Sequence, residues 1–199
     1  NLHHWHWHLV YPSAGPVEIV RKDRRGEPFY YMHNQLLNRY QTDRYAQGLG
    51  RVESLTSFRN PIRVPYYSKI LRSSNNRTYP PRYPNMMVSD VVRPNDRLNV
   101  TIASMESWIA QVVAAIDAGV VVGVCGTSVP LDDPTGIDIL VNLVERSALS
   151  INRNLYGDIH NSGHTLLAYI RDPRGTYLES FGVVGGLTTA VRDPTFYRW

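Results

Sequence analysis

The sequence begins Asn1-Leu2-His3-His4-Trp5-His6-Trp7-His8-Leu9-Val10-Tyr11-Pro12, with four histidines and two tryptophans in six consecutive positions. Because proline and glycine are absent before Pro12, the stretch predicts a helix that stops there. A strand would place His4, His6 and His8 on one face, whereas a helix places only His4 and His8 together, at i and i+4. The other histidines of the chain decide between these alternatives.

Three further histidines lie in segments with a helical pattern. His33 falls within residues 29–45, where apolar residues recur every three or four positions, and it is expected to face the interior. His160 and His164 are four residues apart on a helix that Asp158 would cap and that would run to about residue 170. One spacing then explains both pairs, so we interpret the first stretch as a helix.

Neutral imidazole is the commonest metal ligand in proteins, and this use of histidine predicts a metal site. A single interior histidine such as His33 is more often a hydrogen-bonded core residue, but the two spaced pairs favour ligation. His33 can complete a three-histidine site with His4 and His8. The pair at 160 and 164 still needs a third ligand.

His3 and His6 fall off the ligand face of the predicted helix, and we interpret them as supporting or packing residues. The residues between His160 and His164 are Asn, Ser and Gly, so the glutamate that serves hydrolytic zinc sites is missing. The single cysteine, Cys125, excludes an internal disulfide and a thiolate-rich metal site. Two all-histidine sites therefore favour a copper pair, which binds and uses dioxygen.

The remaining pattern predicts a mainly α protein with long irregular connections. Helices are expected from about 101 to 118 and from 137 to 149, with a hairpin or loop at 120–131 and a break at 154–157. Residues 51–100 contain six prolines and are expected to be largely irregular. The net charge of +4 comes from scattered basic residues and gives little support for nucleic acid binding. The sequence has no membrane-spanning run and no signal-peptide pattern.

Four motifs resemble the arthropod haemocyanin and prophenoloxidase superfamily. They are His3-His4-Trp5-His6-Trp7-His8-Leu9-Val10-Tyr11-Pro12, Phe29-Tyr30-Tyr31-Met32-His33, Gly157-Asp158-Ile159-His160-Asn161-Ser162-Gly163-His164 and Arg192-Asp193-Pro194-Thr195-Phe196-Tyr197-Arg198-Trp199. The resemblance spans the whole chain. It implies a four-helix bundle carrying a type-3 dicopper centre, in the middle domain of a three-domain subunit.

The resemblance also implies the ligands of each ion. By this resemblance, copper A is bound by His4, His8 and His33, and copper B is bound by His160 and His164. In the family, the third copper B ligand is the histidine directly after Phe-Tyr-Arg-Trp, and this chain stops at Trp199. We therefore expect residues 1–199 to be a partial central copper-binding domain, inactive in isolation, without the N-terminal and C-terminal domains of the full protein.

Residues 149–153, 156–158 and 51–53 resemble insect-type prophenoloxidase more than an oxygen carrier. This implies a zymogen that oxidises o-diphenols to quinones with O2, and whose activity can include hydroxylation of monophenols, in melanin formation and innate defence. Its implied partners are phenolic small molecules, an activating protease and other subunits of an oligomer, and its implied location is extracellular, in the haemolymph. No catalytic side chain can be named. A haemocyanin-type oxygen carrier and a copper-free storage hexamerin are the alternatives. Arg171 and Gly186 depart from the family pattern and could alter the surroundings of copper B.

Overall fold

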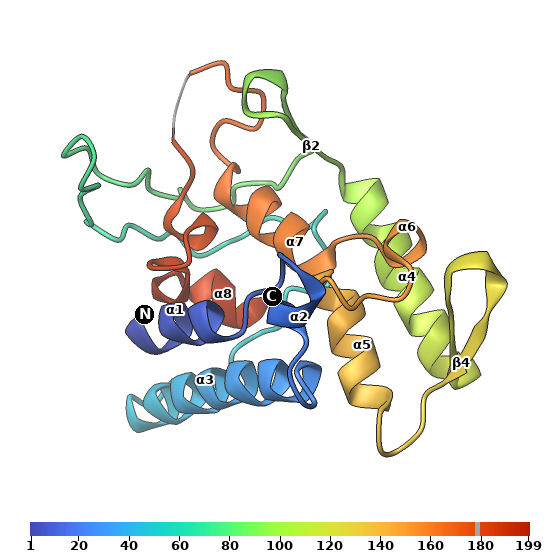
Figure 1. The fold of residues 1–199 in the computed structure, drawn as a ribbon. Helices are drawn as coiled ribbons and strands as arrows, with labels where there is room; N and C mark the ends of the chain where they lie inside the picture. Colours follow the sequence, from blue (N-terminus) through green and yellow to red (C-terminus); the bar gives the residue numbers. More distant parts are fainter. Residues whose placement is uncertain (178–179) are drawn as a thin grey trace. The chain divides into compact units, whose positions relative to one another are not determined.

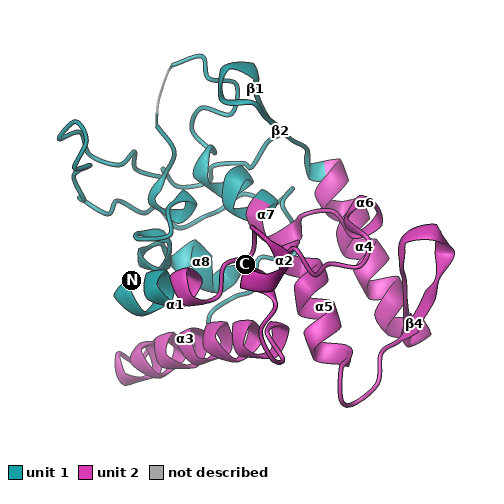
Figure 2. Ribbon diagram, in the orientation of Figure 1, with its two compact units in different colours: residues 1–6, 52–102, 162–199 teal, residues 7–51, 103–161 magenta. Residues whose placement is uncertain are grey.

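The computed structural model describes residues 1–177 and 180–199. Helices dominate it, which confirms the predicted fold class (Figure 1). The chain forms two compact units, each built from several segments (Figure 2). Unit 1 comprises residues 1–6, 52–102 and 162–199, and unit 2 comprises residues 7–51 and 103–161.

Eight α-helices are present in the described residues, and three of them, α1, α4 and α7, contribute residues to both units. The helices are α1 (Leu2–Val10), α2 (Val17–Val20), α3 (Gly26–Ala46), α4 (Ile102–Ala118), α5 (Gly136–Glu145), α6 (Arg153–Tyr156), α7 (Ile159–Ala168) and α8 (Pro194–Arg198). The helical interpretation of the first stretch is confirmed by α1. None of the described helices is long and apolar enough to cross a membrane.

Unit 2 is organised around the packing of α3 on α5. At Gly26 an added Cβ would lie less than 3.0 Å from the backbone of Asp138, so only glycine allows this approach. The Gly26 amide donates to the Asp138 carboxylate at 2.5 Å. The predicted hairpin is present as β3 (Val120–Val122) and β4 (Ser128–Pro130), and the Val122 amide donates to the Tyr156 hydroxyl at 2.9 Å.

Two boundaries in unit 2 differ from the prediction. Helix α5 ends at Glu145 and not at 149, because Arg146 adopts a left-handed conformation with φ of 54°. The predicted break at 154–157 instead contains the single turn of α6. This turn forms because the Asn152 side chain accepts a hydrogen bond from the Leu155 amide and satisfies an otherwise unpaired donor.

Unit 1 contains most of the segment expected to be irregular. Its only extended pairing within the described residues is β1 (Val91–Arg93) with β2 (Leu98–Val100), together with isolated bridges such as Ile62–Met86. Buried ion pairs hold this segment, and one of them joins Arg82 to Asp193 at 2.6 Å. Asp193 also accepts from the Thr195 amide at 2.9 Å. Asp193 caps α8 and Pro194 is its first residue, although an Asp-Pro pair can also mark a break between elements. Short 3-10 helices complete the chain: η1 (Pro94–Asp96), η2 (Val124–Gly126), η3 (Val183–Gly185) and η4 (Ala190–Arg192).

Candidate metal centre

Unit 2 brings together three of the five histidines predicted as ligands. The ring of His8, from α1, lies 5.8 Å from that of His33, on α3, and 6.1 Å from that of His160, on α7, between centroids. The His33 and His160 rings are 6.2 Å apart. The Phe29 ring packs among them, stacked on His33 at 4.1 Å. One phenylalanine thus supports imidazoles from three helices.

A hydrogen bond fixes which nitrogen of His33 is able to bind a metal. Its Nδ1 lies 2.8 Å from the Phe29 carbonyl oxygen, one turn earlier on α3. A carbonyl oxygen only accepts, so Nδ1 must carry the proton in the neutral ring, and the Nε2 lone pair remains for a metal. Metal-binding histidines in proteins are commonly oriented by such a bond to a backbone carbonyl.

The same arrangement recurs in unit 1, at His4 and His164. The Nδ1 of His4 lies 3.1 Å from the Leu187 carbonyl oxygen, and the Nδ1 of His164 lies 2.5 Å from that of Val184. The Phe196 ring packs near both imidazoles, with centroids 5.4 Å from His4 and 6.2 Å from His164. In both neutral rings Nδ1 therefore carries the proton, and Nε2 is the nitrogen able to bind a metal.

Burial keeps these two imidazoles neutral. It lowers the pKa of His4, although the hydrogen bond to the Leu187 carbonyl opposes this shift. It lowers the pKa of His164 to about 4, and the Val184 carbonyl again opposes the shift. A metal ligand must be unprotonated, so both rings are in the state that binds metal at neutral pH.

Acid should destabilise the metal-free protein through His164. The unfolded chain takes up this proton near pKa 6.5 and the folded chain only near pKa 4, so between these pH values the unfolded state binds more protons. Lowering the pH across this range should therefore cost about 3 kcal/mol of unfolding free energy. Urea unfolding at a series of pH values measures the loss. The His164→Gln variant should lose less stability over the same range, and an unchanged pH dependence in this variant would contradict the assignment.

His3 and His6 are exposed on α1, which contradicts their interpretation as packing residues, whereas a supporting role stays a prediction. The sequence also missed the residues that contact His164. The Trp199 ring lies 4.9 Å from its imidazole, at a steep angle. A Cβ at Gly163 would lie less than 3.0 Å from this indole, so the glycine before His164 makes room for the tryptophan.

The two departures from the family pattern lie in different surroundings. Arg171 stacks on the Tyr83 ring, with its guanidinium carbon 4.7 Å from the centroid, and it donates to the Pro81 carbonyl at 3.5 Å. Gly186 directly precedes Leu187, whose carbonyl holds His4. A substitution at Gly186 is therefore expected to disturb the predicted ligand His4 more directly than a substitution at Arg171 would.

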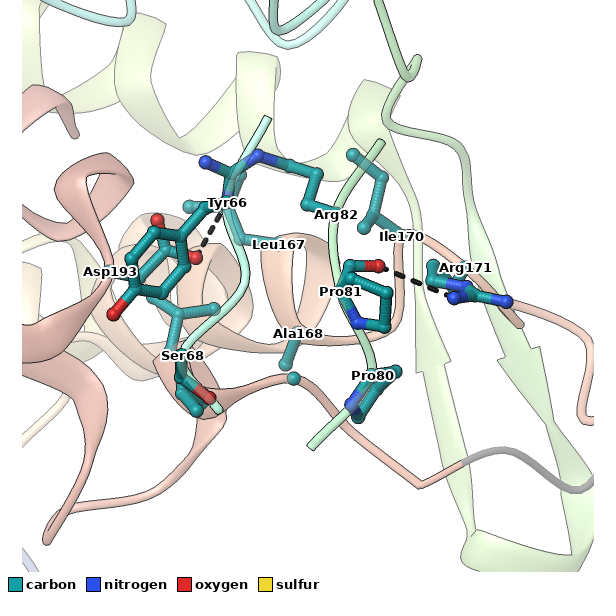
Figure 3. A pocket seen from close by; sticks show the side chains of 13 residues that line it. Tyr66, Ser68, Pro80, Pro81, Arg82, Leu167, Ala168, Ile170, Arg171 and Asp193 are labelled. Carbon is teal, nitrogen blue, oxygen red and sulfur yellow. Dashed lines mark hydrogen bonds and ion pairs between the residues drawn. The ribbon is translucent and has the colours of Figure 1, made fainter. Parts of the chain in front are cut away.

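A small pocket lies in unit 1 beside α7 (Figure 3). The Arg82–Asp193 ion pair forms part of its lining, and Tyr66 and Pro81 lie around it in Figure 3. Burial raises the pKa of the Tyr66 hydroxyl, and the Asp193 charge adds to this effect. Histidine is absent from the described residues that line the pocket, so the pocket is separate from the predicted ligands.

Comparison with known proteins places these features in a family. The domain family described as "Hemocyanin, copper containing domain" matches residues 1–199. Phenoloxidase 8 of Anopheles gambiae is 68% identical over 199 residues, and phenoloxidase 2 of Drosophila melanogaster is 50% identical over 200 residues. Both alignments cover all of this chain, which spans only 28% and 29% of the lengths of those proteins.

Two solved structures share the fold. A crystal structure of a hemolymph type prophenoloxidase from a crustacean aligns with a TM-score of 0.91 and 32% identity, covering 98% of this chain and 30% of that one. Scorpion hemocyanin in its activated state aligns with a TM-score of 0.91 and 35% identity, covering 99% of this chain and 31% of that one.

Proposed function

Because the chain belongs to the family of the copper-containing hemocyanin domain, we propose that residues 1–199 form part of the central domain of a longer phenoloxidase. Two copper ions are held by imidazole nitrogens. Copper A is bound by His4, His8 and His33, and copper B by His160, His164 and a ligand from outside these residues. The reaction is the oxidation of o-diphenols to quinones by O2.

The orientation of the imidazoles carries this proposal. His4, His33 and His164 each donate Nδ1–H to a backbone carbonyl, so each presents Nε2. All five proposed ligands are imidazole nitrogen donors, and such a set suits copper better than the oxygen-preferring Mg²⁺ or Ca²⁺. The residues present therefore fit the metal of the family.

The protein's part in the reaction follows from these contacts. A bound copper pair supplies dioxygen binding and electron transfer from the phenol. The backbone carbonyls of Phe29, Val184 and Leu187 keep the imidazole protons on Nδ1, so that Nε2 is the nitrogen that would bind the metal. The rings of Phe29 and Phe196 pack against the imidazoles and limit the access of water.

The similarity to phenoloxidases supports an enzyme over an oxygen carrier. The mosquito relative at 68% identity and the fruit fly relative at 50% are both named phenoloxidases. The scorpion hemocyanin shares the fold at 35% identity and makes a carrier the second candidate. A copper-free storage protein fits less well, because five predicted ligand positions are histidine.

The location, oligomeric state and activation of the full protein are part of the same proposal. It works outside the cell, in haemolymph, as an oligomer whose zymogen is activated by a protease that cleaves outside residues 1–199. Support comes from the family resemblance and from the crustacean structure, which is described as hemolymph type.

Copper analysis and an oxidation assay on the full-length protein test the proposal. We expect two copper ions per chain and, after limited proteolysis, oxidation of dopamine to its quinone with consumption of O2. Reversible O2 binding without quinone formation would show that the protein is an oxygen carrier and not an enzyme. A purified full-length protein that binds no added copper would overturn both.

A further inference from the structure

The guanidinium of Arg25 is fully buried in unit 2, directly before α3. It forms a two-pronged ion pair with Glu145 on α5: Nη1 donates to one carboxylate oxygen, and Nη2 donates to the other at 3.1 Å. Nη1 also lies 3.3 Å from the Asn142 side-chain oxygen. A buried charge is tolerated only when its partners satisfy it, so this cluster must form as a unit.

The same guanidinium also binds the end of α1. Its Nη2 donates to the carbonyl oxygens of Tyr11 at 3.2 Å and Pro12 at 2.9 Å. These carbonyls directly follow the last residue of α1, and Tyr11 is three residues after His8. Arg25 therefore ties the exit of the helix that carries His8 to the start of the helix that carries His33.

The polar network continues toward the segment that precedes α7. The Ser147 hydroxyl donates to the Asn142 side chain at 2.6 Å, and Arg153 donates to the Ser147 carbonyl at 2.7 Å. Arg153 opens α6, and α6 leads to the Asp158 cap and to His160. The segments that carry all three clustered imidazoles of unit 2 are thus connected to one buried guanidinium.

We propose that Arg25 is a positioning residue for copper A, acting by fixing the end of α1 against the start of α3 and so the separation of His8 and His33. The inference rests on the proposed function, because it requires these two histidines to bind copper. Arginine suits the role because its planar fork holds Glu145 with two nitrogens while reaching the two carbonyls. The ammonium group of lysine lacks this geometry.

The Arg25→Lys variant of the full-length protein tests the inference in a His160→Ala/His164→Ala background, where only copper A remains. Competition of the protein with a chromophoric Cu(I) chelator measures affinity at a temperature well below unfolding. We expect an affinity loss of about 10- to 100-fold, as is typical when a residue that orients metal ligands is removed. If Arg25→Lys does not fold, Glu145→Gln, which keeps the shape of the side chain, should lower the affinity in the same direction.

The matched control is Arg93→Lys. Arg93 is also buried and ion-paired, to Asp172 at 3.2 Å, but it belongs to unit 1, and its partners Asp96, Asp172 and Tyr169 are not predicted ligands. This variant should lose thermal stability while keeping its copper A affinity. Equal affinity losses in the two lysine variants, or an affinity within twofold of the parent in both Arg25→Lys and Glu145→Gln, would overturn the inference. Failure of His33→Ala to weaken copper binding in the same assay would instead overturn the proposed function.

Discussion

Replacing His33 with alanine is expected to lower the copper content of the full-length protein from two ions per chain to one and to abolish dopamine oxidation. The reason is the fixed orientation of the ring. Nδ1–H is committed to the Phe29 carbonyl at 2.8 Å, and the imidazole lies beside those of His8 and His160. Alanine removes the only side-chain donor that α3 contributes to the proposed ligand set.

The affinity for the lost ion should fall by more than the roughly 10- to 100-fold that removal of a partner behind a ligand costs. Metal analysis after dialysis against a chelator measures the stoichiometry. The control is His6→Ala, which removes an exposed imidazole of the same dense stretch and should leave two ions bound. If the His33→Ala variant still binds two ions, His33 is not a ligand. It would then be a hydrogen-bonded core residue, which is the commoner role of a lone interior histidine.

The features that could be predicted from sequence depend on local spacing. His4 with His8, and His160 with His164, are one helical turn apart, and this relation needs only the helix to form. The carbonyls of Leu187 and Val184 could not be predicted as partners. Every residue carries a carbonyl, so the sequence holds no signal for which ones reach His4, 183 positions away, and His164, 20 positions away.

Helix ends were harder to predict than helix interiors, because the same residues stop or start a helix. Asp193-Pro194 directly follows η4 and can be read as a break, yet aspartate is also a good cap and proline suits the first turn. The buried contact of Asp193 with Arg82, 111 residues earlier, favours the start of α8. His3 and His6 show a related limit: the helical pattern excludes them from the ligand face but leaves open whether anything covers them.

Replacing Gly157 with alanine is expected to destabilise the protein by about 3–5 kcal/mol, from backbone strain and overpacking together. Gly157 has φ of 65° and ψ of −139°, a conformation that side chains rarely adopt. An added Cβ would also lie less than 3.0 Å from the Trp108 indole. The strain falls directly before Asp158, whose carboxylate caps α7 by accepting from the Asn161 amide at 3.1 Å, so the start of the helix that carries His160 should be disturbed.

Denaturant unfolding of the metal-free protein measures the loss without interference from copper binding. Gly50→Ala is the control, because its added methyl group would meet nothing within 4 Å and its φ lies outside the left-handed region. That variant should stay within about 0.5 kcal/mol of the parent. A Trp108→Ala background distinguishes the two causes of destabilisation at Gly157, backbone strain and overpacking, because it removes the indole. There Gly157→Ala should retain only the backbone part, about 1–3 kcal/mol, because removal of the ring relieves the overpacking. A penalty that is the same with and without Trp108 would mean that the indole does not require glycine at this position.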